Sequence, residues 1–188
     1  MATIKRIDHV ALVVADIEES LGFWRDALGL ELDHIKEVPR EKSAIAFLPV
    51  GGSEVELVQP TTDDSGIAKY LEKRGAGMHH ICLETDDIEA MAKALSRKHK
   101  LTTIVTLGSD GALATSGDEI IRVPAMAVTA VDTTGAGDAF IGTLAAGLTE
   151  GLDLEAAMKR GCIGAALACT KPGAMPSYAS RQEILTLT

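Results

Sequence analysis

A repeat in the N-terminal half of the chain constrains its fold more than any other feature. Residues 7–18, IDHVALVVADIE, recur as residues 78–89, MHHICLETDDIE, which aligns His9 with His80, Asp16 with Asp87 and Glu18 with Glu89. Each copy has the pattern of a strand that leads into a helix. A histidine at the same position of two equivalent strands indicates a duplicated metal-site motif.

A motif of a different kind follows in the second half. The strands expected after the first copy of the repeat have no second copy, and the chain instead runs into DTTGAGDAF at residues 132–140. A glycine-rich turn that opens a helix is typical of phosphate-handling sites. The two halves therefore carry motifs that belong to different chemistries.

Length and charge indicate small-molecule partners. A chain of 188 residues can form one domain or two small ones, and its net charge of −9 with no basic run argues against nucleic acid as a partner. The N-terminus lacks the apolar core of a signal peptide, and no apolar stretch approaches the length of a membrane span, so we expect a cytoplasmic protein without a membrane partner. The three cysteines, Cys82, Cys162 and Cys169, have no metal-type spacing and are expected to be reduced, buried thiols.

The first half has the periodicity of a βαβββ unit. We expect a strand at 7–14, a helix at 17–28 capped by Asp16 with Glu19 and stopped by Gly29, and strands at 30–38, 43–50 and 53–60. A helix at 67–74, closed by Gly75, then leads into the repeat strand at 78–84.

The second half alternates strands and helices. Residues 87–99 should form one helix, capped by Asp86 with Glu89, with an apolar face of Ile88, Met91, Ala92 and Leu95. Then follow a buried strand at 101–107, a hairpin at 111–123, helices at 139–148 and 154–170, and a last helix capped by Ser180 with Glu183. The fold class is α+β to α/β, in which a βαβββ unit is joined through a helix to an α/β segment.

Three residues of the first half are candidate metal ligands: His9, Glu56 and His80. Strand alternation turns Glu56 to the same face as Val58 and away from Leu57, and two imidazoles with a carboxylate suit a divalent first-row ion. The alternative is that a histidine at a strand start is an ordinary polar residue. His34 and His99 have no matching partner and are expected to be solvated.

These residues carry a resemblance. The segments IDHVALVV, FWRDALGLEL, AFLPVGGSEVELVQPT and IAKYLEKRGAGMHHICLETDDIEA resemble the methylmalonyl-CoA epimerases of the vicinal-oxygen-chelate (glyoxalase-like) superfamily, over residues 5 to about 95. The resemblance implies a divalent ion of the Co, Mn, Ni or Zn type at His9, Glu56 and His80, an acyl-CoA substrate, and removal of the proton α to its carbonyl. It also implies a further glutamate, both ligand and base, that has no counterpart after residue 99.

The turn Gly135, Ala136, Gly137 and Asp138 is the candidate anion site of the second half. Consecutive N–H groups at a helix N-terminus attract an anion, and a carboxylate there can accept a proton from an attacking hydroxyl. A β-branched side chain at Gly137 would be expected to crowd the turn. Taken alone, the same residues also fit an ordinary helix start.

The surrounding segments carry a second resemblance. TIVTLGSDGALA, VTAVDTTGAGDAFIGTLAAGLTEGLDLEAAM and TKPGAMPS, in that order, resemble the C-terminal part of ribokinases of the PfkB sugar kinase family, from about 101 to 188. The resemblance implies Asp138 as the catalytic base, Gly135 to Gly137 as an anion hole, ATP with Mg²⁺ near Thr106 and Gly108, and Cys162 in place of an asparagine beside the adenine. It implies a monovalent cation, such as K⁺, at Asp132, Thr134, Ala168, Lys171, Gly173 and Ser177.

Four interpretations follow from the two resemblances. The chain is an epimerase remnant, a phosphotransferase remnant, a fused chain with neither activity complete, or a joined reading frame that is never made as a protein. We favour the fused chain, with an epimerase-like part at 1–99 whose second repeat is truncated and a kinase-like part at 100–188, the junction lying within about 90–104. The kinase's sugar-binding region and the epimerase's base are both missing, although pairing of two βαβββ units in a homodimer is an alternative that would close the metal site.

Overall fold

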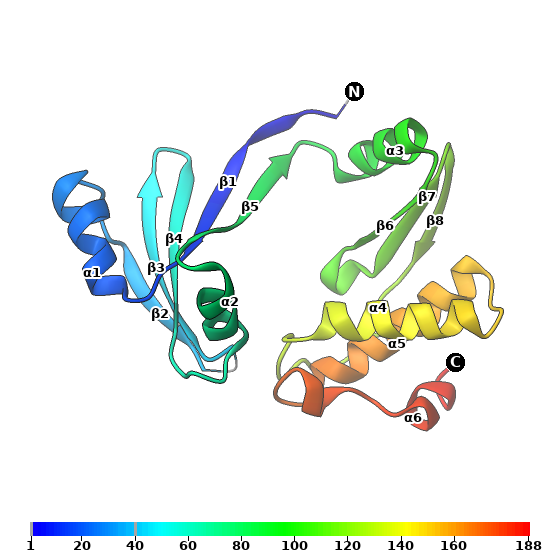
Figure 1. The fold of residues 1–188 in the computed structure, drawn as a ribbon. Helices are drawn as coiled ribbons and strands as arrows, with labels where there is room; N and C mark the ends of the chain where they lie inside the picture. Colours follow the sequence, from blue (N-terminus) through cyan, green and yellow to red (C-terminus); the bar gives the residue numbers. More distant parts are fainter. Residues whose placement is uncertain (1, 40) are drawn as a thin grey trace. The chain divides into compact units, whose positions relative to one another are not determined.

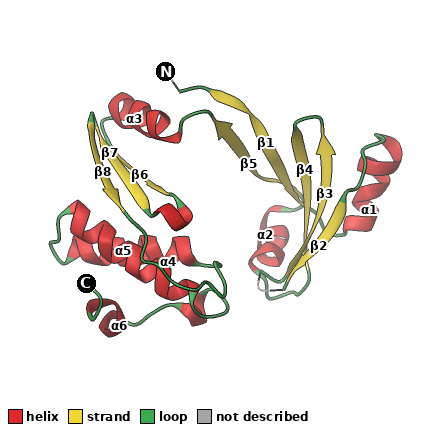
Figure 2. Cartoon of the chain, turned by 180° about the vertical axis from the view of Figure 1, so that it is seen from behind, coloured by secondary structure: helices red, strands yellow, loops and turns green. Residues whose placement is uncertain are grey.

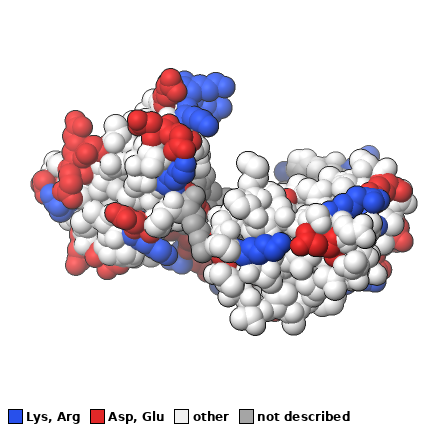
Figure 3. Space-filling view, turned by 90° about the horizontal axis from the view of Figure 1, so that it is seen from below, with Lys and Arg blue, Asp and Glu red and all other residues white. Residues whose placement is uncertain are grey.

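The computed structural model describes residues 2–39 and 41–188 (Figure 1). It divides into two compact units, Ala2–Asp86 and Asp87–Thr188. Each unit has its own hydrophobic core. On the face shown in Figure 3, acidic side chains gather over the N-terminal unit, whereas much of the surface of the C-terminal unit carries neither charge.

The N-terminal unit is built around one mixed sheet. Its elements are β1 (Ile4–Val13), α1 (Ile17–Leu21), the π-helical turn η1 (Gly22–Ala27), β2 (His34–Val38), β3 (Ser43–Val50), β4 (Ser53–Pro60), α2 (Gly66–Arg74) and β5 (Gly77–Thr85). The strand order is β2-β3-β4-β1-β5, in which β1 and β4 are parallel and all other neighbours are antiparallel. The expected βαβββ order is confirmed.

The core of this unit lies between the sheet and the α1–η1 segment. Ala46 and Leu48 of β3 and Leu57 of β4 are buried against α1. The other buried residues of this core are Val14, Ile17 and Leu21. The expected helix at 17–28 is present only as α1 followed by η1, in which Leu28 N–H donates to the carbonyl of Phe23, five residues back. Asp16 caps α1 by accepting from the N–H of Glu19, as expected.

The C-terminal unit has a three-stranded antiparallel sheet in the order β6-β7-β8. Its elements are α3 (Ile88–His99), β6 (Thr102–Thr106), the 3₁₀ turn η2 (Gly108–Asp110), β7 (Ala112–Ser116), β8 (Glu119–Val123), α4 (Ala136–Thr149), α5 (Leu154–Cys169), the 3₁₀ turn η3 (Met175–Ser177) and α6 (Arg181–Leu185). Helices α4 and α5 lie side by side and pack on the sheet through Ala112, Ala114 and Val123 (Figure 2). The expectation of a buried strand at 101–107 is wrong, because β6 is an edge strand whose end residues are exposed.

Residues 87–99 do form one helix, with its cap, but the capping residue differs from expectation. Asp87, not Asp86, accepts from the N–H of Ala90. Asp86 instead accepts hydrogen bonds from the backbone N–H and the hydroxyl of Thr3, which lower the pKa of its carboxyl group. The capping residue is therefore one position later than the sequence suggested.

The packing face of α3 matches the expected apolar face only at Ala92. Ala92 and Ser96 are buried where the helix packs on β6 and β7, whereas Ile88 and Leu95 are 46% and 44% exposed. The helix thus uses a face of small residues for this sheet. None of the helices that the structure describes combines the length and apolar character needed to cross a membrane.

Replacing Ser96 by alanine should destabilise the C-terminal unit by about 1–3 kcal/mol. The buried hydroxyl lies 2.6 Å from the carbonyl oxygen of Leu101 and 3.1 Å from that of Thr115, and it accepts from the N–H of Gly117 at 2.9 Å, so alanine removes all three contacts. Urea unfolding followed by circular dichroism measures the loss, while fluorescence of Trp24, the single tryptophan, reports on the N-terminal unit.

Ser116→Ala, at an exposed position of β7, is the matched control and should change stability by less than about 0.5 kcal/mol. Equal effects of the two substitutions would show that the Ser96 hydrogen bonds do not stabilise the unit.

Candidate functional sites

The three candidate metal ligands come from three adjacent strands. His9 lies on β1, Glu56 on β4 and His80 on β5, and β1 is the strand between the other two. Ala11 is the register partner of both Glu56 and His80, and His9 lies two residues along β1 on the same face. The side-chain ligand atoms of all three lie within 4.8 Å of one another, so the expected convergence is confirmed.

The two imidazole rings lie nearly perpendicular to each other, at 82°. His9 Nε2 lies 3.0 Å from His80 Nε2, so at least one of these nitrogens is unprotonated. The pKa of His80 is lowered, mainly by burial and then by the neighbouring His79 and His9. The negative charge of Glu56 acts in the opposite direction. The neutral imidazole is the form that binds a metal ion, and two such nitrogens with a carboxylate fit a divalent first-row ion.

Two irregularities in the β1–β5 ladder lie beside these histidines. Between Ile7 and His9 the register advances two residues on β1 for one on β5, and between His80 and Met78 it advances two on β5 for one on β1. The extra residues are Asp8 and His79. Their side chains contact the histidine next to them, Asp8 Oδ2 at 3.1 Å from His9 Nδ1 and His79 Nδ1 at 2.8 Å from His80 Nδ1.

Sequence reasoning missed Asp8 and His79 because strand alternation assigns neighbours to opposite faces, and a bulge overrides that rule. It also treated Cys82 as a buried thiol, whereas Cys82 is only partly buried and lies near His9. Cys169 is likewise only partly buried, and of the three cysteines Cys162 alone is buried as expected. His34 and His99 are exposed, as expected.

The glycine-rich turn forms the start of α4. Gly135 is the N-cap residue with φ of 80°, and Ala136, Gly137 and Asp138 occupy the first helical turn, where backbone N–H groups have no partner within the helix. Asp138 is exposed. A Cβ atom at Gly135 would lie 2.9 Å from Ala174 Cα, so the turn packs closely against the segment before η3.

The expected crowding at Gly137 is wrong. A Cβ atom there would meet no atom within 4 Å, because Gly137 is a helical residue on the open side of the turn. Within this turn, the position where both space and backbone angle require glycine is Gly135.

A cavity of about 530 Å³ brings the expected nucleotide residues together with two residues of the glycine-rich turn, whereas Gly135 and Asp138 are not among the residues that line it. Thr106 and Gly108 line it from the end of β6, and Ala136 and Gly137 line it from α4. Cys162 of α5 lines the same cavity, and burial raises the pKa of its thiol. Among the described residues that line this cavity none is charged, so an anion there would be held by backbone N–H groups and by the hydroxyls of Thr106, Ser109 and Thr133.

The expected cation residues are only partly brought together. Asp132 is 7% exposed, and its carboxylate accepts from the N–H of Thr134 at 3.0 Å and of Gly173 at 2.6 Å. The carbonyl of Ala168 accepts from the N–H of Lys171 at 3.3 Å, and the Lys171 ammonium pairs with Glu183 of α6. The hydroxyl of Ser177 donates to the carbonyl of Ala174. The geometry thus joins Asp132, Thr134 and Gly173 in one loop cluster.

Comparison with known proteins separates the two parts of the chain. Residues 6–118 match the Glyoxalase/Bleomycin resistance protein/Dioxygenase superfamily, and residues 72–181 match the pfkB family of carbohydrate kinases. The two matches overlap over residues 72–118, a range that contains α3.

Relatives of both kinds are found. The chain is 36% identical over 109 residues to the mitochondrial methylmalonyl-CoA epimerase of Homo sapiens, covering 56% of this chain and 62% of the relative. It is 45% identical over 98 residues to the deoxyribokinase of Salmonella typhi, covering 52% of this chain and 32% of the relative. The crystal structure of a ribokinase from Thermotoga maritima superposes with a TM-score of 0.52 at 36% identity, covering 53% of this chain and 34% of that one.

The chain therefore spans less than two thirds of the length of this epimerase and about a third of the length of the kinases. Its five-stranded sheet with the paired histidines and its glycine-rich turn at the start of α4 belong to separate parts of the sequence. The chain belongs to two families at once, the glyoxalase superfamily through its epimerase-like N-terminal part and the pfkB carbohydrate kinases through its C-terminal part.

Proposed function

We propose that this chain is a fusion that binds a divalent metal ion in its N-terminal part and a nucleotide or phosphate in its C-terminal part, and that completes neither parent reaction. The observation that carries the proposal is the convergence of His9, Glu56 and His80 within 4.8 Å, on strands that are distant in sequence. Such a donor set fits a Co, Mn, Ni or Zn ion with positions left open for substrate.

The epimerase-like part retains ligands and lacks a base. A bound ion would polarise the thioester carbonyl of an acyl-CoA, and a base must then take the α proton. In this chain β5 is an edge strand, and the strands that follow it, β6 to β8, form a separate sheet. The second-repeat strands that would carry the further glutamate are therefore replaced, and loss of a base removes several kcal/mol of transition-state stabilisation.

The kinase-like part retains an anion site and lacks a sugar site. The N–H groups at the start of α4, the cavity beside them and the exposed carboxylate of Asp138 are all formed by residues after Asp87. Phosphoryl transfer also needs the acceptor hydroxyl within reach of the base, and positioning of that kind requires residues that surround the sugar. The part of the chain ahead of β6 is the epimerase-like sheet with α3, so those residues are absent from this segment.

We expect two separate ligand effects on unfolding. Mn²⁺ should raise the midpoint of the thermal transition followed by Trp24 fluorescence, and a non-hydrolysable ATP analogue with Mg²⁺ should raise the midpoint of the transition followed by circular dichroism. A ligand in hundredfold excess over its Kd stabilises the native state by about 2.7 kcal/mol. The same preparation should release no ADP in response to ribose.

The controls replace each ligand by one that should bind less well. Mg²⁺ alone should leave the Trp24 transition in place, and AMP should protect less than the triphosphate analogue because it lacks the terminal phosphates. Ribose-dependent ADP release that disappears in Asp138→Asn would instead make the chain a working carbohydrate kinase.

A second candidate is an epimerase completed by dimerisation. It is favoured by the edge position of β5 and by the exposure of Ile81 and Leu83 on that strand, at 45% and 53%. Sedimentation of the metal-loaded chain, together with exchange of the α proton of methylmalonyl-CoA in deuterated water, tests this candidate. A monomer that exchanges no proton excludes it.

A further inference from the structure

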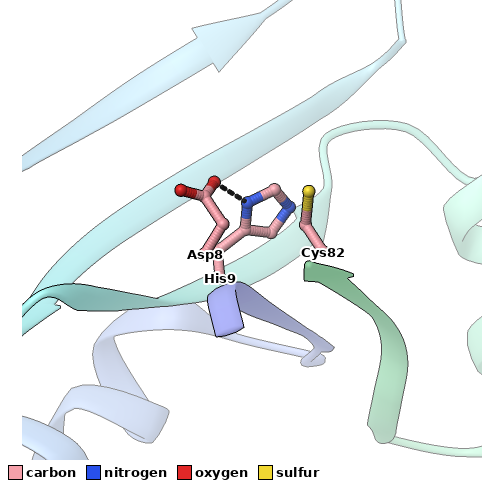
Figure 4. A group of neighbouring side chains, drawn as sticks. All are labelled: Asp8, His9 and Cys82. Atoms are coloured by element: carbon pink, nitrogen blue, oxygen red, sulfur yellow. Dashed lines mark hydrogen bonds and ion pairs between the residues drawn. The ribbon is translucent and has the colours of Figure 1, made fainter. Parts of the chain in front are cut away.

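A second group of ligand atoms lies beside the histidine pair. Asp8, His9 and Cys82 each offer one ligand atom, and these atoms lie within 4.8 Å of one another (Figure 4). All three side chains are partly buried. Figure 4 shows the Cys82 sulfur beside the imidazole of His9, with the Asp8 carboxylate on the other side of the ring.

The register of β1 on β5 and a bulge in β1 place these residues together. Cys82 is the register partner of His9, so the two side chains start from directly opposed positions of β1 and β5. Asp8 is the extra residue of the bulge between Ile7 and His9, and a bulge turns consecutive side chains toward the same side. In a regular strand Asp8 would point to the opposite face.

Ion pairs surround the group on the Asp8 side. One oxygen of the Asp8 carboxylate faces His9, and the other pairs with Arg6 at 3.1 Å. Arg6 also pairs with Glu84, a carboxylate that Lys5 approaches at 3.9 Å, so two cations and two carboxylates offset one another beside the group. With Cys82 as a thiolate, the group offers a carboxylate, an imidazole and a sulfur.

We propose that Asp8, His9 and Cys82 form a second metal position, selective for a borderline-soft divalent ion such as Zn²⁺ or Co²⁺. A thiolate excludes hard ions such as Mg²⁺, whereas the combination of sulfur, nitrogen and oxygen ligands is one that zinc accepts. Coordination removes the thiol proton of Cys82, which passes to the solvent as the sulfur–metal bond forms. His9 has two ring nitrogens and belongs to both groups, so this position depends on His9 but not on Glu56 or His80.

The test is an anaerobic titration of the metal-free full-length chain with Co²⁺, followed by near-ultraviolet absorption. A sulfur-to-cobalt charge-transfer band should appear, disappear in Cys82→Ser and in His9→Ala, and persist in Cys169→Ser, which removes a thiol from the other unit. Zn²⁺ should bleach the band by displacing Co²⁺, whereas a large excess of Mg²⁺ should not.

His80→Ala separates this position from the metal site proposed above. The band should persist in that variant, because His80 contributes nothing to the sulfur group. If the band appears in wild type and in His80→Ala but Mn²⁺ does not raise the midpoint of the Trp24 transition, the site at His9, Glu56 and His80 is refuted and the second metal position stands. Absence of the band in wild type, its survival in Cys82→Ser, or its loss in His80→Ala would overturn the second metal position.

Discussion

Replacing His9 by alanine should reduce the affinity of the N-terminal unit for divalent ions by at least a hundredfold, or about 3 kcal/mol. His9 is the one residue common to both groups of ligand atoms, so its removal leaves Glu56 with His80 on one side and Asp8 with Cys82 on the other. Two remaining donors hold an ion poorly. Elemental analysis after dialysis and a Mn²⁺ titration by calorimetry measure the change.

The matched control for this substitution is His34→Ala. His34 is exposed on β2 of the same unit, where its ring stacks on Phe47, and it belongs to neither group of ligand atoms. Metal affinity should be unchanged in that variant. A metal content that is the same in His9→Ala and in wild type would contradict a specific site at the histidine pair.

Replacing Gly135 by alanine should destabilise the C-terminal unit by about 2–4 kcal/mol. The substitution places a side chain on a residue with φ of 80° and puts its Cβ 2.9 Å from the backbone of Ala174 and 3.0 Å from the ring of Tyr178. Neither the strained backbone nor the close contact with backbone atoms can relax without moving the turn. The midpoint of urea unfolding followed by circular dichroism should fall, and the Trp24 transition should remain in place.

Gly137→Ala is the control for the same turn. Gly137 is helical and its Cβ would meet open space, so alanine should leave stability unchanged or raise it by up to about 1 kcal/mol. Two substitutions of the same kind, two residues apart, thus have opposite expected signs. Equal destabilisation by both would show that the turn does not have the conformation described.

The sequence predicted an element well where the residues that form it are also the residues that stabilise it. The strands expected at 43–50 and 53–60 are β3 and β4 with the same bounds, because alternation of apolar residues and the turn at Gly51 and Gly52 are local. The helix stop at Gly75 and the capping box of Ser180 with Glu183 were also correct for this reason. Caps and turns are satisfied by neighbours in the chain.

Errors arose where a neighbour distant in sequence decides the outcome. Asp87 and not Asp86 caps α3, because the carboxylate of Asp86 accepts hydrogen bonds from Thr3, near the start of the N-terminal unit. Of the expected apolar face of Ile88, Met91, Ala92 and Leu95, Ala92 is buried together with Ser96 on the side that packs on β6 and β7, whereas Ile88 and Leu95 are exposed. A periodic pattern identifies an apolar face and does not specify which sheet covers it.

The sequence by itself determined the two ancestries, the order of the elements and the identity of His9, Glu56 and His80, because a repeat and a motif are properties of residue order. Only the tertiary structure decided that Asp8 and Cys82 join His9, that Gly135 and not Gly137 is the constrained glycine, and that the strands after α3 form their own sheet. The physical reason is that ladder register, bulges and close backbone approach are set by pairing between segments far apart in the chain, and a one-residue shift in register redirects each side chain of the shifted segment.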